Sequence, residues 1–261
     1  MVPGYGNMAA AVTGFYELTG WPDRSPAGPY LAYTDGVSPR FMLATLLAAL
    51  RHRDATGKGQ HIDVSQAEAA IHMLAPAIHH YGANGEIWSR QGNRDLNMCP
   101  HGVYQVAGDD RWIAIACQDD EAWQSLSQLL PEIEAETGSL AARQAIEDQL
   151  DAVLTEWCAG QDGAELQATL IAAGIAAHVV QDSQMCSADE QYQYRGHFVT
   201  LPQAVSGEVV VESSRFQLHG TPSVIKRGPP ATGEHNIEVL TEVLGYDEDR
   251  LADVLSSLCM E

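Results

Sequence analysis

The chain has 261 residues, a hydrophobic content of 45% and a formal net charge of −21 at pH 7. This length allows one large domain or two modest ones, and the composition is typical of a folded globular protein. So acidic a chain repels phosphate groups, which argues against nucleic acids and anionic membranes as partners. The beginning, MVPGYGNMAAAV, lacks the basic region of a signal peptide, and no apolar run reaches the length of a membrane helix. We therefore expect a cytoplasmic protein.

Five cysteines are scattered along the chain, and none belongs to a CxxC pair. This pattern argues against a disulfide framework and against a zinc site, so we expect reduced thiols in the core. The histidines, including the neighbours His79 and His80, have no metal-ligand spacing with acidic residues. We expect no bound metal.

Residues 1–90 are predicted to be mainly helical. Apolar residues recur at helical spacing in AAAVTGFYELTG and FMLATLLAALRHR, with a turn rich in glycine and proline between them. The stretch TGKGQHIDVSQAEAAIHML predicts a glycine turn, a short strand HIDVS and a helix. Ser65 and Glu68 form a capping box at the start of that helix.

Residues 91–195 are predicted to form a linker loop and a small α/β domain. The loop is polar and irregular, and VYQVAG and WIAIAC then alternate like two strands joined by a GDD turn. Three helical segments follow, in DDEAWQSLSQLL, ARQAIEDQLDAVLTEWCAG and ELQATLIAAG, and IAAHVVQ predicts another strand. Ser187 and Glu190 repeat the capping-box pattern.

Residues 196–261 are predicted to return the chain to the larger unit. They contain a strand-like segment, GEVVVESSRFQLHG, a loop, TPSVIKRGPPATGEHN, and two helices, one from Asn236 to Gly245 and one in DEDRLADVLSSL. The fold class is therefore α/β, with a small module inserted into a larger unit.

The stretch from Gly28 to Ala70 carries the most specific pattern. Asp35 in YTDG is followed by a long apolar helix, then by TG-x-GQ, a D-V-S segment and a helix with an early glutamate. This combination resembles the signature of the family III coenzyme A transferases, the carnitine dehydratase and bile-acid-inducible (CaiB/BaiF) family, which includes formyl-CoA and carnitine CoA-transferases. GNR before PHGVY, at residues 92–104, and GEHN before EVLTEVLGY extend the resemblance.

The resemblance implies a Rossmann-like large domain, a small domain and two chains threaded through each other as an interlocked dimer. We expect the large domain here to be incomplete, because the family's N-terminal coenzyme-binding segment would precede Tyr5. The implied partners are an acyl-CoA, a small carboxylic acid and either a second copy or an N-terminal CoA-binding chain. The coenzyme A thioester is a substrate, and no tightly bound cofactor is expected. The acidity of the chain, with two lysines, fits a division in which another polypeptide holds the phosphates.

The resemblance implies that Asp35 is the catalytic nucleophile. A carboxylate suits this role because its acyl adduct is a mixed anhydride, which a thiolate or a second carboxylate can attack in turn. Its position before a predicted helix, taken alone, favours an N-cap aspartate, and the surrounding signature favours the nucleophile instead. Tyr5 lies thirty residues earlier, where related racemases carry a histidine. A phenol is a poor general base at neutral pH, so Tyr5 favours transfer over racemisation and is expected to contact substrate or to pack a helix start.

Gln91, Gly92, Asn93 and Arg94 match the region before a glycine-rich flap in formyl-CoA transferases, and we expect them to contact substrate or coenzyme A. The following DLNMCPHG has one glycine where those enzymes have a run, which predicts a stiffer flap and leaves the substrate class open. Two alternatives also stay open. In the first, the chain is an acyl-CoA racemase or isomerase of the same fold. In the second, it is a non-catalytic partner subunit of a split transferase.

Overall fold

The computed structural model describes residues 4–130 and 137–257, which belong to two compact units. The first unit ends at Val180 and the second begins at Gln181. The division of the chain into segments 1–90, 91–195 and 196–261 stays a prediction. In the described residues, no helix is both long and apolar enough to cross a membrane.

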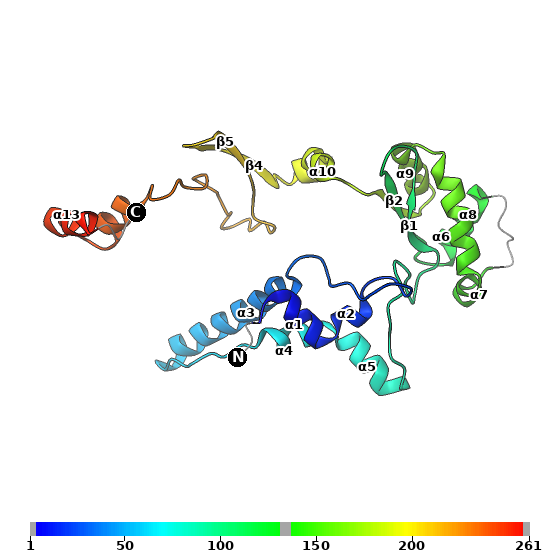
Figure 1. Ribbon diagram of the computed structural model, residues 1–261, viewed down its shortest axis with the longest axis horizontal. Helices are drawn as coiled ribbons and strands as arrows, with labels where there is room; N and C mark the ends of the chain where they lie inside the picture. Colours follow the sequence, from blue (N-terminus) through cyan, green and yellow to red (C-terminus); the bar gives the residue numbers. More distant parts are fainter. Residues whose placement is uncertain (1–3, 131–136, 258–261) are drawn as a thin grey trace. The chain divides into compact units, whose positions relative to one another are not determined.

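The first unit begins with a helical part, as predicted (Figure 1). Its helices are α1 (Gly6–Thr13), α2 (Phe15–Leu18), α3 (Tyr33–Thr56), α4 (Gln66–Met73) and α5 (Ala75–Asn84). Gly14 ends α1 and Gly57 ends α3, both in the left-handed backbone conformation that glycine adopts without strain. Ser65 accepts a hydrogen bond from the backbone N–H of Glu68, which confirms the predicted start of α4.

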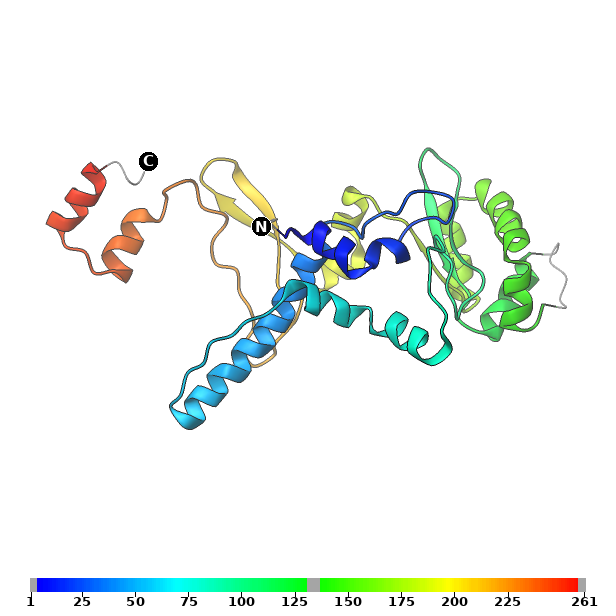
Figure 2. The ribbon, with the colours of Figure 1, turned by 60° about the horizontal axis from the view of Figure 1, so that its bottom comes forward.

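The predicted strand HIDVS is wrong. Residues 61–65 have no regular secondary structure, and segment 57–65 runs back alongside α3 without a neighbouring strand (Figures 1 and 2). A strand needs a partner for its backbone hydrogen bonds, and the described part of the chain offers none here.

Small side chains let α1, α3 and α4 approach one another closely. Ala10 and Ala70 are completely buried and pack with Phe15, and Tyr33 lies against the same cluster. The rings of Phe15 and Tyr33 are 5.1 Å apart between centroids. These contacts bring together the first turns of the three helices, which carry the groups described below.

The second part of the first unit is the α/β module, residues 99–180. Its antiparallel sheet has the strand order β1 (His101–Gln105), β2 (Trp112–Ala116), β3 (Ala176–Val179). The helices are α6 (Asp120–Leu129), α7 (Leu140–Ala145), α8 (Glu147–Ala159) and α9 (Gly163–Ala172). The two predicted strands and the strand in IAAHVVQ are thereby confirmed, because strict alternation of apolar residues is a strong local signal.

One face of this sheet forms the core of the module. Tyr104, Ile113 and Ile115 are buried together with residues of all three longer helices, among them Leu126, Leu154, Leu166 and Leu170. The opposite face carries Val103, Ala114 and His178, which are aligned across the strands and are not fully buried. Successive residues of a strand point to opposite faces, so this second face is open.

Buried thiols contribute to the same core. Cys99, Cys117 and Cys158 are free and buried, as predicted, and burial raises the pKa of Cys158 to about 12. Cys186 is also free but only half-buried, which corrects the prediction for that residue. Cys259 lies outside the described residues.

The second unit contains a β-hairpin and short helices. Its elements are α10 (Ser183–Ala188), α11 (Glu190–Tyr194), β4 (Phe198–Gln203), β5 (Gly207–Glu212), α12 (Asn236–Glu238), the π-helical turn η1 (Val239–Val243) and α13 (Glu248–Ser256). The predicted capping box of Ser187 and Glu190 is wrong, because Ser187 lies inside α10. Asp189 caps α11 instead, accepting hydrogen bonds from the backbone N–H groups of Gln191 and Tyr192.

Both sheets of the described residues are antiparallel. A parallel, Rossmann-like sheet is therefore not formed by these residues, and the expected large domain and interlocked dimer stay predictions.

Candidate active site

Asp35 lies within the first turn of α3 and its residue is exposed. The N-cap position of this helix is Ala32, and no side chain caps it, so the interpretation of Asp35 as an N-cap is wrong. The neighbouring Thr34 is completely buried. The start of α3 thus presents one carboxylate outward and keeps one hydroxyl inside.

A hydrogen-bonded chain joins Asp35 to the two neighbouring helices. The side-chain amide nitrogen of Gln66, the first residue of α4, donates to Oδ1 of Asp35 and to Oγ1 of Thr34, the latter at 2.9 Å. The hydroxyl of Thr34 donates to the backbone carbonyl of Gly6, also at 2.9 Å. Gly6 is the first residue of α1, so three helix starts converge on this carboxylate.

Glycine is required at position 6 for this close approach. A Cβ atom placed there would lie 2.6 Å from the Cβ of Ala32 and 2.8 Å from both Cγ and Oδ2 of Asp35. Such distances are well below van der Waals contact, so the backbone of α1 packs directly against the carboxylate. Tyr5 precedes this glycine and occupies the N-cap position of α1, with 68% of its surface exposed. Its predicted role toward substrate stays a prediction.

The predicted loop 91–94 lies at the entry to the α/β module and is fixed by specific contacts. The backbone N–H of Gly92 donates to the carbonyl of Gly20 at 2.9 Å. Gly92 has φ +66°, and a Cβ there would lie 2.4 Å from the ring of Trp21. Only glycine fits both the backbone conformation and the space, so this position holds the loop against the 20–21 turn.

Arg94 is surrounded by carboxylates of α8. Its guanidinium lies 2.5 Å from Oδ1 of Asp148, 2.9 Å from Oδ2 of Asp151 and 3.5 Å from Oε2 of Glu147. The hydrogen bond with Asp148 raises the pKa of Arg94 further above its already high value. The hydroxyl of the buried Tyr104 donates to Asp151 at 2.9 Å. These contacts tie the loop to the module, and the predicted contact of Arg94 with substrate or coenzyme stays a prediction.

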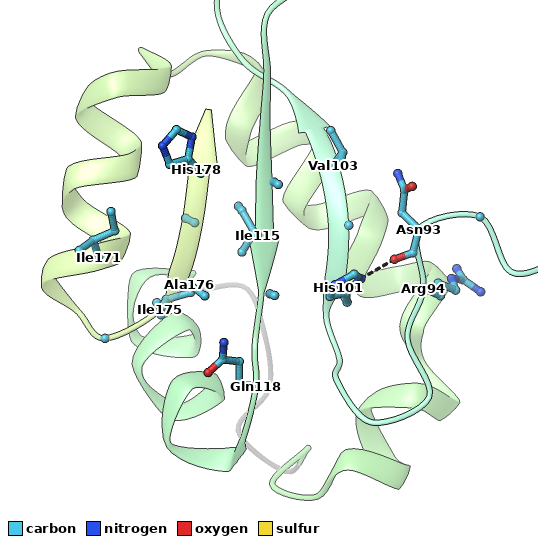
Figure 3. Close-up of a pocket in the computed structure, with 16 residues that line it drawn as sticks. Asn93, Arg94, His101, Val103, Ile115, Gln118, Ile171, Ile175, Ala176 and His178 are labelled. Carbon is cyan, nitrogen blue, oxygen red and sulfur yellow. Dashed lines mark hydrogen bonds between the residues drawn. The ribbon is translucent and has the colours of Figure 1, made fainter. Parts of the chain in front are cut away.

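Two cavities border this loop. A cavity of about 870 Å³ lies over the open face of the sheet, between the Asn93 loop and His178, with Gln118 at one end (Figure 3). His101 contacts the backbone carbonyl of Asn93 through its Nδ1, the dashed line of Figure 3. A carbonyl can only accept, so Nδ1 is the protonated nitrogen.

The second cavity, of about 590 Å³, also borders the loop and shares part of its lining with the first. It is lined by Trp21, Arg90, Gln91, Arg94 and Glu147, among others. Asp35 and Tyr5 line neither of these two cavities. The structure therefore shows two predicted groups, one at the start of α3 and one at the 91–94 loop, and does not bring them into one cavity.

Three residues at Asp35 were missed from the sequence: Gly6, Thr34 and Gln66. Two of them adjoin predicted positions, since Gly6 follows Tyr5 and Thr34 precedes Asp35. Gln66 follows the capping serine of α4 but lies 31 residues from Asp35, and only the packing of α3 on α4 reveals their contact. Among residues 4–130 and 137–257, no three histidine, cysteine, aspartate or glutamate side chains are grouped as metal ligands.

The chain is similar in sequence to several CoA-transferases. It is 27% identical to a succinyl-CoA–D-citramalate CoA-transferase of Chloroflexus aurantiacus, with 95% of this chain and 63% of that protein covered. It is 28% identical to the beta subunit of a succinyl-CoA–L-malate CoA-transferase of the same organism, with 97% and 64% covered. The chain thus spans somewhat less than two thirds of the length of these relatives.

Solved structures give the same relationship. The crystal structure of a CaiB/BaiF family protein from Brucella suis superposes with a TM-score of 0.80 at 27% identity, covering 93% of this chain and 65% of that one. Residues 1–236 match the sequence profile of CoA-transferase family III. The chain belongs to the family III CoA-transferases, as its Asp35 signature predicts.

Proposed function

We propose that this chain carries the nucleophile of a CoA-transferase, which moves coenzyme A from an acyl-CoA to a carboxylic acid through covalent adducts on Asp35. The observation that carries the proposal is the exposed carboxylate of Asp35, held by Gln66 through one oxygen. Transferases named for this reaction are similar over nearly the whole chain. No observation favours the racemase or isomerase alternative, and Tyr5 is a poor base for it.

The proposed reaction conserves the activated bond. The carboxylate of Asp35 attacks the thioester carbonyl, the carbon–sulfur bond breaks, and the CoA thiolate leaves a mixed anhydride behind. The thiolate attacks Cγ of Asp35, and the donor acid departs as a carboxylate. The acceptor carboxylate then attacks the resulting aspartyl-CoA thioester to give a second anhydride. Attack of the released thiolate on the acceptor acyl group gives the new acyl-CoA and restores Asp35.

The names of the relatives narrow the substrates to test. Three relatives of this chain are named for succinyl-CoA as donor and for D-citramalate, L-malate or mesaconate as acceptor. All three acceptors are small dicarboxylic acids. We therefore propose succinyl-CoA and a small dicarboxylic acid as the first pair to test.

We also propose that the site is completed by a partner. Two relatives are named as alpha and beta subunits of one transferase. The chain has 14 lysines and arginines against 35 acidic residues. A second copy of this chain, or a chain with a CoA-binding segment, would supply further positive groups for the coenzyme phosphates. The transfer is therefore to be assayed with the chain alone and with such a partner.

Trapping of the adduct tests the proposal directly. The protein is incubated with succinyl-CoA and other acyl-CoA thioesters, quenched with hydroxylamine and mapped by mass spectrometry. We expect modification at Asp35, complete loss of it in Asp35→Ala, and retention in the control Asp54→Ala, an exposed aspartate of the same helix. A wild-type protein that turns over without modification at Asp35 would overturn the proposal.

A further inference from the structure

Gln66 donates a hydrogen bond to Asp35, and the proposed reaction assigns no chemical role to this hydrogen bond. It is the first residue of α4 and half-buried, and its amide nitrogen lies within hydrogen-bonding distance of both Asp35 and Thr34. A long polar side chain loses rotamer freedom when it is held at two points. The arrangement therefore calls for a reason beyond helix packing.

The surrounding groups fix the orientation of this amide. The hydroxyl hydrogen of Thr34 is donated to the carbonyl of Gly6, so its oxygen can only accept from Gln66. A carboxylate of Asp35 is likewise an acceptor. The side-chain group of Gln66 that lies between Oγ1 of Thr34 and Oδ1 of Asp35 must then be the NH2 group. Each of its two hydrogens has one acceptor.

The two oxygens of Asp35 are therefore not equivalent. Oδ1 accepts the hydrogen bond from Gln66, whereas Oδ2 accepts none in the described part of the chain and lies on the side of Gly6. The oxygen without a donor has its lone pairs free for attack on a thioester carbonyl. Oδ2 becomes the bridging atom of the anhydride, and Oδ1 remains the carbonyl oxygen of the aspartyl group.

We propose that Gln66 is a catalytic residue, the oxyanion donor for every attack on Cγ of Asp35; this inference rests on the proposed function. When the CoA thiolate attacks Cγ of the anhydride, the negative charge moves onto Oδ1 before the Cγ–Oδ2 bond breaks and the donor acid leaves. The same charge forms when the acceptor carboxylate attacks the aspartyl-CoA thioester. The N–H of Gln66 is already placed at that atom, which is the geometry that electrostatic stabilisation requires.

The proposal separates two kinds of step. In the first attack, on the acyl-CoA, the charge develops on the acyl oxygen and not on Oδ1 of Asp35, the atom to which Gln66 donates. Removal of the amide should therefore slow formation of the aspartyl-CoA thioester by about 10²–10³, the effect of losing one oxyanion donor, and slow formation of the anhydride by much less. The aspartyl-CoA thioester adds the mass of coenzyme A to the protein, whereas the anhydride adds the mass of the acyl group. One experiment therefore measures both adducts.

The experiment is rapid-quench mass spectrometry of the protein in the assembly that modifies Asp35. Gln66→Met, which keeps length without a donor, is compared with wild type, and Gln124→Met on the exposed side of α6 is the matched control. We expect Gln66→Met to accumulate the acyl adduct and to form the CoA adduct slowly, with the rate of acyl-adduct formation little changed. Equal slowing of both adducts, or no slowing, would contradict a role at Oδ1.

Gln66→Glu provides a second test that does not depend on the first variant. The introduced carboxyl can donate to Oδ1 only when protonated, so CoA-adduct formation should recover as the pH is lowered. Gln66→Met should show no such recovery. Absence of an acid-side recovery in folded Gln66→Glu would also count against the proposal. Absence of any adduct in wild type would instead refute the proposed function.

Discussion

Gly6 is the residue on which the geometry at Asp35 depends most directly. Gly6→Ala would place a methyl group 2.6 to 2.8 Å from Ala32 and the carboxyl of Asp35, and α1 would have to move away from α3. Overpacking of this kind costs about 1–3 kcal/mol. We expect a lower free energy of unfolding, measured in urea, together with loss of the Asp35 adduct.

A second glycine provides the control for Gly6→Ala. Its substitution adds the same methyl group to a helix but creates no close contact. Gly82 lies inside α5, and a Cβ there would meet nothing within 4 Å. Gly82→Ala should stabilise the protein by up to about 1 kcal/mol and leave the adduct intact. If Gly6→Ala behaved like Gly82→Ala, the close packing of α1 on Asp35 would be refuted.

At the scale of elements, the start of α8 joins the 91–94 loop to the α/β module. Glu147 begins this helix, and burial raises its pKa although Arg94 acts in the opposite direction. A carboxyl whose pKa is raised on folding stabilises the protein below its unfolded pKa, and this contribution is lost as the pH rises through the folded value. Glu147→Gln should therefore equal wild type in stability near pH ~4 and become more stable than wild type toward neutral pH.

Urea unfolding at a series of pH values measures this difference. Glu156→Gln, at an exposed position of the same helix, is the control. Its free energy of unfolding should not diverge from that of wild type as the pH rises. If Glu147→Gln instead became less stable relative to wild type as the pH rose, the attraction to Arg94 would outweigh the burial of Glu147.

Elements with local signals could be predicted from the sequence. Alternation gave the strands around Tyr104 and Ile113, and the serine cap gave the start of α4. The strand expected at HIDVS failed because pairing depends on a neighbour that the local pattern does not reveal. The cap expected at Ser187 failed because Asp189, two residues on, has a side chain with the same capacity to accept backbone hydrogen bonds.

The same distinction holds for the candidate site. The spacing around Asp35 predicted the family, since it forms part of a long and specific pattern, and the family resemblance led to Asp35 as the proposed nucleophile. The roles of Gly6 and Gln66 could not be predicted, because they depend on the approach of α1 and α4 to α3 rather than on any local signal. The three carboxylate neighbours of Arg94 on α8 could not be predicted either, because they lie more than 50 residues further along the chain.

For the whole molecule, the buried core is distributed unevenly between the two units. The α/β module contains a continuous cluster of buried side chains from Cys99 to Ile175. In the described residues of the second unit, Leu240 is the one buried hydrophobic side chain. Val205, Phe216, Val224 and Val243 of that unit each expose more than 60% of their surface. Burial of apolar surface is the main favourable term in folding, so the two units should differ in their ability to fold alone.

This difference gives a test on fragments. A fragment of residues 95–180 should unfold cooperatively in urea, because it contains the complete module core and lies in the size range of small autonomous domains. A fragment of residues 181–261 should show no cooperative transition by circular dichroism, since its hairpin and helices enclose almost no core. A cooperative transition in the second fragment would show that its exposed apolar side chains are buried against one another in solution. The second fragment could instead show no cooperative transition alone and gain one when the rest of the protein is added. That result would show that the second unit buries its apolar side chains against surfaces outside itself.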